Sequence, residues 1–336
     1  MRTLVTGGAG FAGSHLCEYL LELGHEVIVV AAEQESLVNI AHLRDRVRVE
    51  RADLRDSRRL TEIVHNTAPR FVYHLAALSS PADSLQSPAL TYEVNFVGTL
   101  NLLLACRQEA PACRFLFVSS SEVYGAVSDR NLPIREDTPL HPANPYAASK
   151  AAGEILAEQF FRSYGLQIIR ARPFNHTGPR QSGGFVCSDF ARQVAEIDLE
   201  MRPPTISVGN LQVKRDFSDV RDIVRGYYLL LEKGEPGDVY HLGSGQATAI
   251  EEILHILMGM TSKPVQPVVD PSRTRGGEAR SLWGDTVKAE QKVGWGRRYD
   301  LKTTLQDLFT YWTQRLRTAT ALISPPPTSD GIRELR

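Results

Sequence analysis

The sequence is short of cysteine, of net charge and of long apolar runs, and each shortage excludes a class of protein. Its four cysteines form no C-x-x-C pair, which argues against a disulfide scaffold or a thiolate metal site and favours a reducing cytoplasm. The 38 basic side chains nearly balance 39 acidic ones, so no overall field favours nucleic acid or an anionic membrane. Gly7 and Gly8 interrupt the first apolar segment, which argues against a signal peptide. No apolar run predicts a membrane span.

The start of the sequence combines a short apolar strand, a glycine-rich loop and a helix. Gly7, Gly10 and Gly13 are each three residues apart. We expect Gly7 to permit a tight turn, Gly10 to let the backbone approach a pyrophosphate, and Gly13 to let the helix pack against the strand. Phe11 and Ala12 would place backbone N–H groups at the helix N-terminus, where phosphate binds. The loop therefore predicts a dinucleotide site, with an ordinary turn as the alternative.

The end of the second strand should distinguish NAD from NADP. An acid there binds the ribose hydroxyls, whereas an arginine accepts a 2′-phosphate. The strand ends at Ala31, and Glu33 follows Gly13 by 20 residues. Glu33 could bind ribose or could be a solvated loop acid. No arginine occurs between Ala31 and Leu43, which favours NAD, but the cofactor is left as NAD(P)H.

Strand-like and helical segments alternate along the first half, which predicts an α/β fold with a Rossmann-type, doubly wound parallel sheet. Residues 1–173 would form the dinucleotide-binding domain, to which 217–243 returns. Residues 174–216 and 244–316 would form a smaller C-terminal substrate domain. Residues 317–336, which include three consecutive prolines, would be a flexible tail.

A second motif combines a helix start with two ionisable residues. Asn144 is a good N-cap, and Pro145 suits the first helical position. Tyr146 and Lys150 would then lie one turn apart on one face. The helix N-terminus and the lysine both favour phenolate, so we expect the pKa of Tyr146 to fall below its ordinary value of ~10. Such a tyrosine could exchange a proton with an alcohol or ketone; the alternative is an unremarkable surface pair.

Together these motifs resemble the extended short-chain dehydrogenase/reductase family, in its nucleotide-sugar branch. The resemblance rests on Thr6–Gly13, His74–Ala77, Asn95, Ser120–Gly125, and Tyr146 with Lys150. Other segments resemble the GDP-mannose branch: Arg172–Pro179, Gly184–Val186, Val208–Leu211, Arg215–Asp222, Val269–Arg275 with Glu278, and Gly294–Trp295. The chain departs from the branch pattern at Gly276, where proline is usual, and at Ala31, where a charged residue is usual.

The resemblance implies roles for individual residues. Tyr146 would protonate the C4 oxygen of a sugar, Ser120 would hydrogen-bond that oxygen, and Lys150 would hold the nicotinamide ribose. Ser120 could instead cap the turn that follows it, and Arg215 could be an ion-pair partner of Asp216. Further cofactor contacts would come from Asp53, Leu54, Leu75, Ala76, Ala77 and Asn95. Substrate contacts would come from Ser79, Asn175, Phe185, Val186, Arg215, Arg275 and Glu278.

The implied reaction is reduction of GDP-4-keto-6-deoxy-D-mannose to GDP-D-rhamnose. The alternatives are a GDP-mannose 4,6-dehydratase with Glu122 as the C5 base, another nucleotide-sugar epimerase or dehydratase, and a dinucleotide-binding protein without activity. The short segment 260–271 favours the reductase. No metal is expected. We also expect a homodimer formed through helices at 92–106 and 145–163, with extra apolar surface from Leu156, Phe160 and Phe161.

Overall fold

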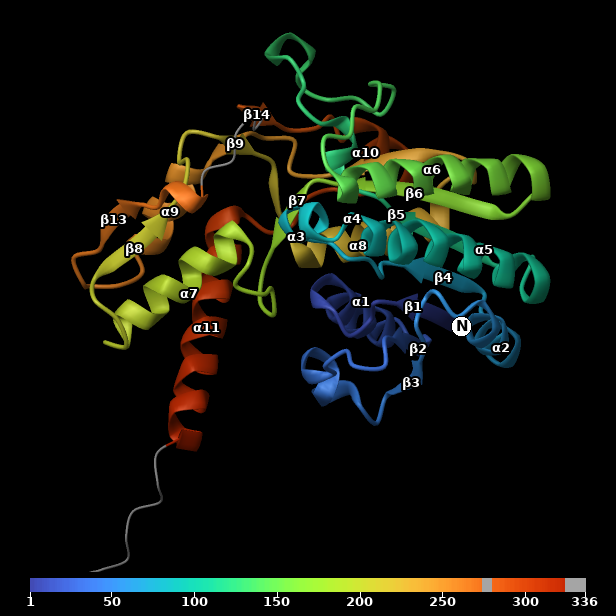
Figure 1. Cartoon of the computed structure of the whole chain (residues 1–336), viewed down its shortest axis with the longest axis horizontal. Helices are drawn as coiled ribbons and strands as arrows, with labels where there is room; N and C mark the ends of the chain where they lie inside the picture. Colours follow the sequence, from blue (N-terminus) through green and yellow to red (C-terminus); the bar gives the residue numbers. More distant parts are fainter. Residues whose placement is uncertain (274–279, 324–336) are drawn as a thin grey trace, which may run out of the picture.

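The computed structural model describes residues 1–273 and 280–323, with side chains to residue 320. Its centre is a seven-stranded parallel sheet (Figure 1), which confirms the predicted fold class. The strands, in spatial order, are β11 (Val239–Leu242), β6 (Gln167–Pro173), β5 (Arg114–Val118), β4 (Phe71–His74), β1 (Arg2–Thr6), β2 (Glu26–Ala31) and β3 (Val47–Arg51).

Helices cover both faces of the sheet, so the inner strands are apolar on both sides. In β2, Val27 and Val29 face one core while Ile28 and Val30 face the other. Each such buried side chain contributes roughly 1.5–3 kcal/mol. The first core lies under α1 (Phe11–Glu22), α8 (Val220–Lys233) and α10 (Val287–Val293); the second lies under α2 (Ser57–Thr67), α5 (Gly98–Glu109) and α6 (Pro145–Tyr164).

A smaller part of the molecule lies to the left of the sheet in Figure 1, on the side where α6 begins. Its core joins α7 (Val186–Asp198), α9 (Ile250–Met258) and α11 (Leu301–Ile323). The last helix therefore continues past residue 316, where the sequence predicts a tail. Three small sheets complete this part: β7 (Asn175–Thr177) with β10 (Phe217–Asp219), β8 (Thr205–Val208) with β13 (Gln266–Val269), and β9 (Lys214–Arg215) with β12 (Thr248–Ala249) and β14 (Ser281–Leu282).

The chain crosses between the two parts more than once. β11 pairs with β6 in the main sheet, and Trp295 lies in the core beneath α1 and α8. Short elements make the remaining connections: η1 (Val38–Leu43), α3 (Pro81–Gln86), α4 (Pro88–Tyr92), η2 (Glu93–Val97), η3 (Ser121–Tyr124), η4 (Asp129–Asn131) and η5 (Pro271–Arg273). The division into two domains remains a proposal.

One helical stretch, Pro88–Glu109, is long and apolar enough to cross a membrane by length and composition, contrary to the expectation from the sequence. In the structure its last segment, α5, packs on α2 and α6. Leu102, Leu103 and Cys106 are fully buried there. The apolar character of this stretch is thus explained by the packing of α5 in the core.

Candidate active site

The glycine loop has the close packing that the sequence predicts. Gly7 has φ +70°, and a Cβ there would lie 2.8 Å from the backbone nitrogen of Ala76. A Cβ on Gly13 would lie 2.0 Å from the Gly7 carbonyl oxygen. Gly10 lies between them as the N-cap of α1. The loop therefore presents bare backbone at the carboxyl edge of the sheet, and this cradle fits a dinucleotide pyrophosphate.

The segments after β2 and β3 hold the two acids that the sequence singles out. Glu33 is exposed, two residues beyond the end of β2. Asp53 is held by Arg55 in an ion pair with an Nη2–Oδ2 distance of 2.7 Å, and Leu54 is buried. The ribose role of Glu33 stays a prediction, and its exposure is also compatible with a solvated loop acid.

Asn95 lies in an irregular turn that the sequence does not predict. Residues 92–106 were expected to form one regular helix, but η2 is a π-helical turn between α4 and α5. The Asn95 side chain accepts a hydrogen bond from the Leu78 N–H at 2.8 Å and donates to the Leu78 carbonyl oxygen at 3.1 Å. It also donates to the Ser149 hydroxyl at 3.0 Å. The π turn, a feature frequent at functional sites, thus joins the loop after β4 to α6.

The N-terminus of α6 forms as predicted. The Asn144 side chain accepts from the Ala147 N–H at 2.8 Å, and Pro145 occupies the first turn. Tyr146 and Lys150 are both buried, so they are not a surface pair. The Lys150 ammonium donates to the carbonyl oxygen of Val118, at the end of β5, at 2.8 Å.

The expected lowering of the Tyr146 pKa is wrong for this structure. Burial raises the pKa of Tyr146 to about 12, and the Glu122 carboxylate adds to the rise, while a hydrogen bond with Ser120 opposes it. Burial also lowers the pKa of Lys150 to about 8, against the opposing charge of Glu154. The desolvation of the phenol is the largest cause of the shift, and Tyr146 keeps its proton at neutral pH.

Ser120 caps the turn that follows it, which is one of the two roles that the sequence left open, and its role toward a substrate oxygen stays a prediction. Its hydroxyl accepts a hydrogen bond from the Glu122 N–H at 3.1 Å, which begins η3, and it also hydrogen-bonds with Tyr146. Ser120, Glu122 and Tyr146 therefore meet at the carboxyl end of β5. A phenol and a hydroxyl side by side can both contact one carbonyl oxygen.

A buried ionic network behind α6 was not found from the sequence. Arg172 donates from Nε and Nη2 to the Glu154 carboxylate, with distances of 2.6–3.0 Å. It also donates from Nη1 to the Tyr124 hydroxyl at 2.5 Å, which in turn bonds with His241 Nε2 at 2.5 Å. The available signal was an acid at position 154, one turn after Lys150 on the same face of the helix.

The loop after β6 lies on the start of α1. His176 stacks on Phe11 with ring centroids 5.9 Å apart. His15 Nε2 is 2.8 Å from the carbonyl oxygen of Pro179. Arg180 donates two hydrogen bonds to Glu18, at 2.7 and 2.5 Å. The segment expected to bind substrate is thus fastened to the segment expected to bind cofactor, through contacts that no local pattern predicts.

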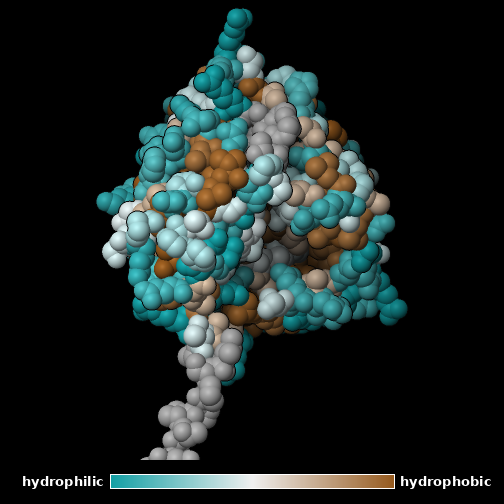
Figure 2. All heavy atoms as spheres, turned by 60° about the vertical axis from the view of Figure 1, so that its left-hand side comes forward, coloured by the Kyte–Doolittle hydropathy of each residue, from teal (hydrophilic) through white to brown (hydrophobic). Residues whose placement is uncertain are grey.

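The other expected substrate residues differ in exposure and lie on more than one segment. Phe185 is 39% exposed and precedes α7, while Asn175 and Val186 are partly buried. Ser79 is exposed before α3. Figure 2 shows a hollow between the two parts of the molecule, with hydrophobic atoms on its wall.

Arg215 is buried, and its Nη1 donates to the Lys214 carbonyl oxygen at 2.9 Å. The Asp216 carboxylate accepts hydrogen bonds from Ser244, Gly245 and Gly284. Asp216 therefore does not depend on Arg215 for its partners. Arg275 and Glu278 lie outside the described residues.

Similarity to known proteins agrees with this geometry. A family model described as GDP-mannose 4,6 dehydratase matches residues 4–308. The chain belongs to this family. GDP-6-deoxy-D-mannose reductase of Pseudomonas aeruginosa is 35% identical over 316 residues, which cover 94% of this chain and 98% of the relative. The human GDP-mannose 4,6 dehydratase is 30% identical over 348 residues, covering 94% and 92%.

Two solved structures share the fold of this GDP-mannose dehydratase family member. RMD from Pseudomonas aeruginosa, complexed with NADPH, has a TM-score of 0.83 at 34% identity and covers 94% of this chain and 99% of its own. DesIV, a dTDP-glucose 4,6-dehydratase from Streptomyces venezuelae with NAD and TYD bound, has a TM-score of 0.84 at 29% identity and covers 95% and 98%. The neighbours thus include both dinucleotides and more than one reaction.

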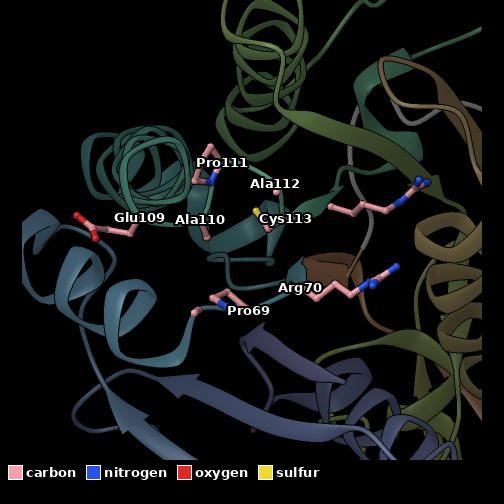
Figure 3. Close-up of a pocket in the computed structure, with 9 residues that line it drawn as sticks. Pro69, Arg70, Glu109, Ala110, Pro111, Ala112 and Cys113 are labelled. Atoms are coloured by element: carbon pink, nitrogen blue, oxygen red, sulfur yellow. The ribbon is translucent and has the colours of Figure 1, made fainter.

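A separate surface pocket of about 480 Å³ lies at the opposite edge of the sheet (Figure 3). Its walls come from Ala68–Arg70 and Glu109–Arg114, where β4 and β5 begin rather than end. Prolines and alanines form much of it, and the strands separate it from Tyr146. Within the described residues no group of acids, histidines or cysteines is arranged to hold a metal ion.

Proposed function

We propose that this protein is an NAD(P)H-dependent reductase that converts GDP-4-keto-6-deoxy-D-mannose to GDP-D-rhamnose. The observation that carries the proposal is the buried phenol of Tyr146, with Ser120 hydrogen-bonded to it at the end of β5. A reductase needs an acid that holds its proton at neutral pH and releases it only when an alkoxide develops. The family membership supplies the substrate class.

The packing of the glycine loop supports a cofactor site at the start of α1. A bound nicotinamide dinucleotide would supply the hydride to C4 of the sugar. Gly7, Gly10 and Gly13 would hold its pyrophosphate against the backbone at the start of α1, and Asn95 would support the loop after β4 at the sheet edge. Lys150, buried beside the end of β5, would meet the nicotinamide ribose. Holding both reactants at one edge is expected to be a large part of the rate enhancement.

The proton moves through the chain's own residues. Tyr146 donates its phenolic proton to the C4 oxygen as the carbonyl becomes an alcohol. Ser120 donates a hydrogen bond to that oxygen as charge develops, which contributes a few kcal/mol in comparable sites, roughly 2.7–4. The ammonium of Lys150 stabilises the phenolate left on Tyr146. The Glu154–Arg172 pair joins α6, which carries Tyr146 and Lys150, to β6.

Two observations favour reduction over dehydration. The relative at 35% identity is a reductase that aligns over 98% of its length. The alignment with the human dehydratase spans 348 positions for the same share of this chain, so that enzyme has additional residues within the aligned region. This agrees with the short segment 260–271. Dehydration remains the second function, since Glu122 lies beside Tyr146 as a C5 base would.

The test is to supply each substrate separately. GDP-4-keto-6-deoxy-D-mannose with NADPH or NADH should consume one reduced nicotinamide per sugar, followed by absorbance, with GDP-D-rhamnose as the product. GDP-mannose without added reductant should react little. The reverse pattern, rapid formation of a keto sugar from GDP-mannose alone, would establish the dehydratase and make Glu122 the base. Binding of either dinucleotide without turnover would support a non-catalytic protein.

We also propose a cytoplasmic homodimer. All four cysteines are free and buried, which suits a reducing compartment. Leu156, Phe160 and Phe161, expected to add apolar surface, instead pack inward against the second core. On α4, η2, α5 and α6, the large apolar side chains that are exposed are Leu90, Tyr92, Val97, Leu104, Ile155 and Tyr164.

Light scattering should therefore give the mass of a dimer. Leu104→Glu should shift the protein toward monomer, because it places a charge in the contact. Leu23→Glu is the matched control, since Leu23 is similarly exposed but lies at the end of α1, away from α5. A monomeric wild-type protein at micromolar concentration would contradict the dimer.

A further inference from the structure

Arg51 lies directly beside the end of β2, although it is far from that strand in the sequence. It is the last residue of β3, and the parallel pairing of the two strands sets it opposite Ala31. Its Nη1 donates to the carbonyl oxygen of Ala32 at 2.5 Å and to that of Glu35 at 2.9 Å. The guanidinium is therefore fastened to the turn that follows β2.

This turn is where a dinucleotide-binding sheet distinguishes its cofactors. In such sheets the adenosine ribose lies at the end of the second strand, where an acid accepts the 2′-hydroxyl and an arginine accepts a 2′-phosphate. Here the strand ends at Ala31, which is buried in the core, and the exposed Ala32 follows it, so neither position supplies a carboxylate. Glu33 is exposed. A phosphate at this point would meet Ala32 and the guanidinium of Arg51.

The arginines around this edge differ in whether an acid pairs with them. Arg48 and Arg59 both bind Glu50, at 2.5 and 2.6 Å, and Arg55 binds Asp53. Among the described residues no carboxylate pairs with Arg51, whose hydrogen bonds to the turn both leave from Nη1. A guanidinium has five N–H donors, so the Nε and Nη2 fork remains for a planar or tetrahedral oxyanion.

Glu35 is the nearby acid that could compete with an oxyanion for the Arg51 guanidinium. Its Oε2 accepts a hydrogen bond from the Ala32 N–H at 3.2 Å, within the same turn. One carboxylate oxygen is therefore engaged by backbone, and burial raises the pKa of Glu35 while Arg51 lowers it. If Glu35 bound a ribose 2′-hydroxyl instead, the site would prefer the cofactor without a 2′-phosphate.

We propose that Arg51 binds the 2′-phosphate of the adenosine ribose and that the chain therefore prefers NADP(H) to NAD(H). The inference rests on the dinucleotide site of the proposed function and adds the residue that selects the cofactor. It reverses the preference that the sequence favoured, because the arginine comes from β3 and not from the residues that follow β2.

The test is equilibrium binding of NADPH and NADH to the full chain without sugar nucleotide, followed by nicotinamide fluorescence. The wild-type protein should bind NADPH more tightly. Arg51→Ala should weaken NADPH binding roughly 10- to 100-fold, the size expected for one charge-assisted phosphate contact, and leave NADH binding within about threefold. Arg51→Lys should recover part of the loss, since it retains the charge but not the fork.

Two further variants separate the outcomes. Arg48→Ala, on the same strand, should leave both affinities unchanged, because Arg48 pairs with Glu50. Glu35→Gln should not weaken NADH binding. Tighter binding of NADH by the wild-type protein would overturn the inference, as would an equal loss of both cofactors in Arg51→Ala, which would mean that Arg51 only holds the turn.

The proposed function would fail differently. If neither dinucleotide bound, the reductase itself would be wrong, and the inference with it. If NADH bound more tightly and still supported reduction of the keto sugar, only the role of Arg51 would be lost.

Discussion

Glu154 receives the guanidinium of Arg172 in a buried ion pair, one helical turn beyond Lys150: Arg172 Nη2 is 2.6 Å from Glu154 Oε2, and both side chains are almost fully enclosed. Removing one charge from such a pair leaves the other buried and unpaired. Glu154→Gln should therefore destabilise the protein by about 3–5 kcal/mol, measured by urea unfolding. The exposed Arg58–Glu62 pair provides the control: Glu62→Gln should cost less than about 1 kcal/mol. If Glu154→Gln cost as little as Glu62→Gln, the Glu154–Arg172 pair would not be desolvated in solution.

The same pair bears on how activity depends on pH. Burial lowers the pKa of Lys150 to about 8, and the nearby charge of Glu154 limits that fall. The proposed reaction uses the ammonium form, so kcat/KM should be level below pH 8 and decrease above it as the proton is lost. Tyr146 keeps its proton through this range, because its pKa is about 12. A profile that rises through pH 8 would show that the neutral amine is the working form.

The stability of the protein should fall in acid. Burial lowers the pKa of His15 to about 4 and of His74 and His241 to about 3. The unfolded chain takes up protons on these rings near pH 6.5 and the folded chain does not, so acid favours unfolding. The contribution of His74 to the free energy of unfolding should decrease progressively below pH 6.5, by about 2 kcal/mol at pH 5. His74→Gln should therefore lose less stability than wild type between pH 7 and 5; His255→Gln, at an exposed site, should match wild type.

Local patterns predicted the features that neighbouring residues determine. The glycine spacing predicted the packing of Gly7 and Gly13, and the Asn144 cap predicted the start of α6, because each depends on a few consecutive residues. The pKa of Tyr146 depends on how deeply tertiary packing buries the phenol, which spacing does not reveal. The position of Arg51 depends on the register between β2 and β3, so a search confined to the residues after β2 misses it.

Gly13 offers a direct test of the loop packing. A Cβ at Gly13 would lie 2.0 Å from the Gly7 carbonyl oxygen, so Gly13→Ala must displace the turn. We expect a loss of roughly 1–3 kcal/mol in stability and a larger loss in dinucleotide affinity, measured by thermal unfolding and fluorescence titration. Gly296→Ala is the matched control, because nothing lies within 4 Å of its Cβ position. Unchanged binding in Gly13→Ala would contradict the assignment of the loop.

Tyr146 and Glu122 together separate the two reactions of the family. Tyr146→Phe removes the acid and should lower turnover of the keto sugar by a factor on the order of 10²–10⁴, with folding and dinucleotide binding retained. Tyr164→Phe, at an exposed position of the same helix, should have no effect. Near-full activity in Tyr146→Phe would remove the basis of the proposed site.

Glu122→Gln gives the complementary result. A reductase takes no proton from C5, so this variant should keep turnover within about tenfold of wild type, losing only what a hydrogen bond in the pocket contributes. A dehydratase would lose its base, and turnover would then fall as far as in Tyr146→Phe. Both variants should be assayed with the keto sugar and reduced cofactor, and with GDP-mannose alone. The pair of substrates matters because the Glu122 carboxylate lies close enough to Tyr146 to raise the pKa of the phenol. Its removal alters the acid as well as the base, and only the difference between the two substrates assigns its role.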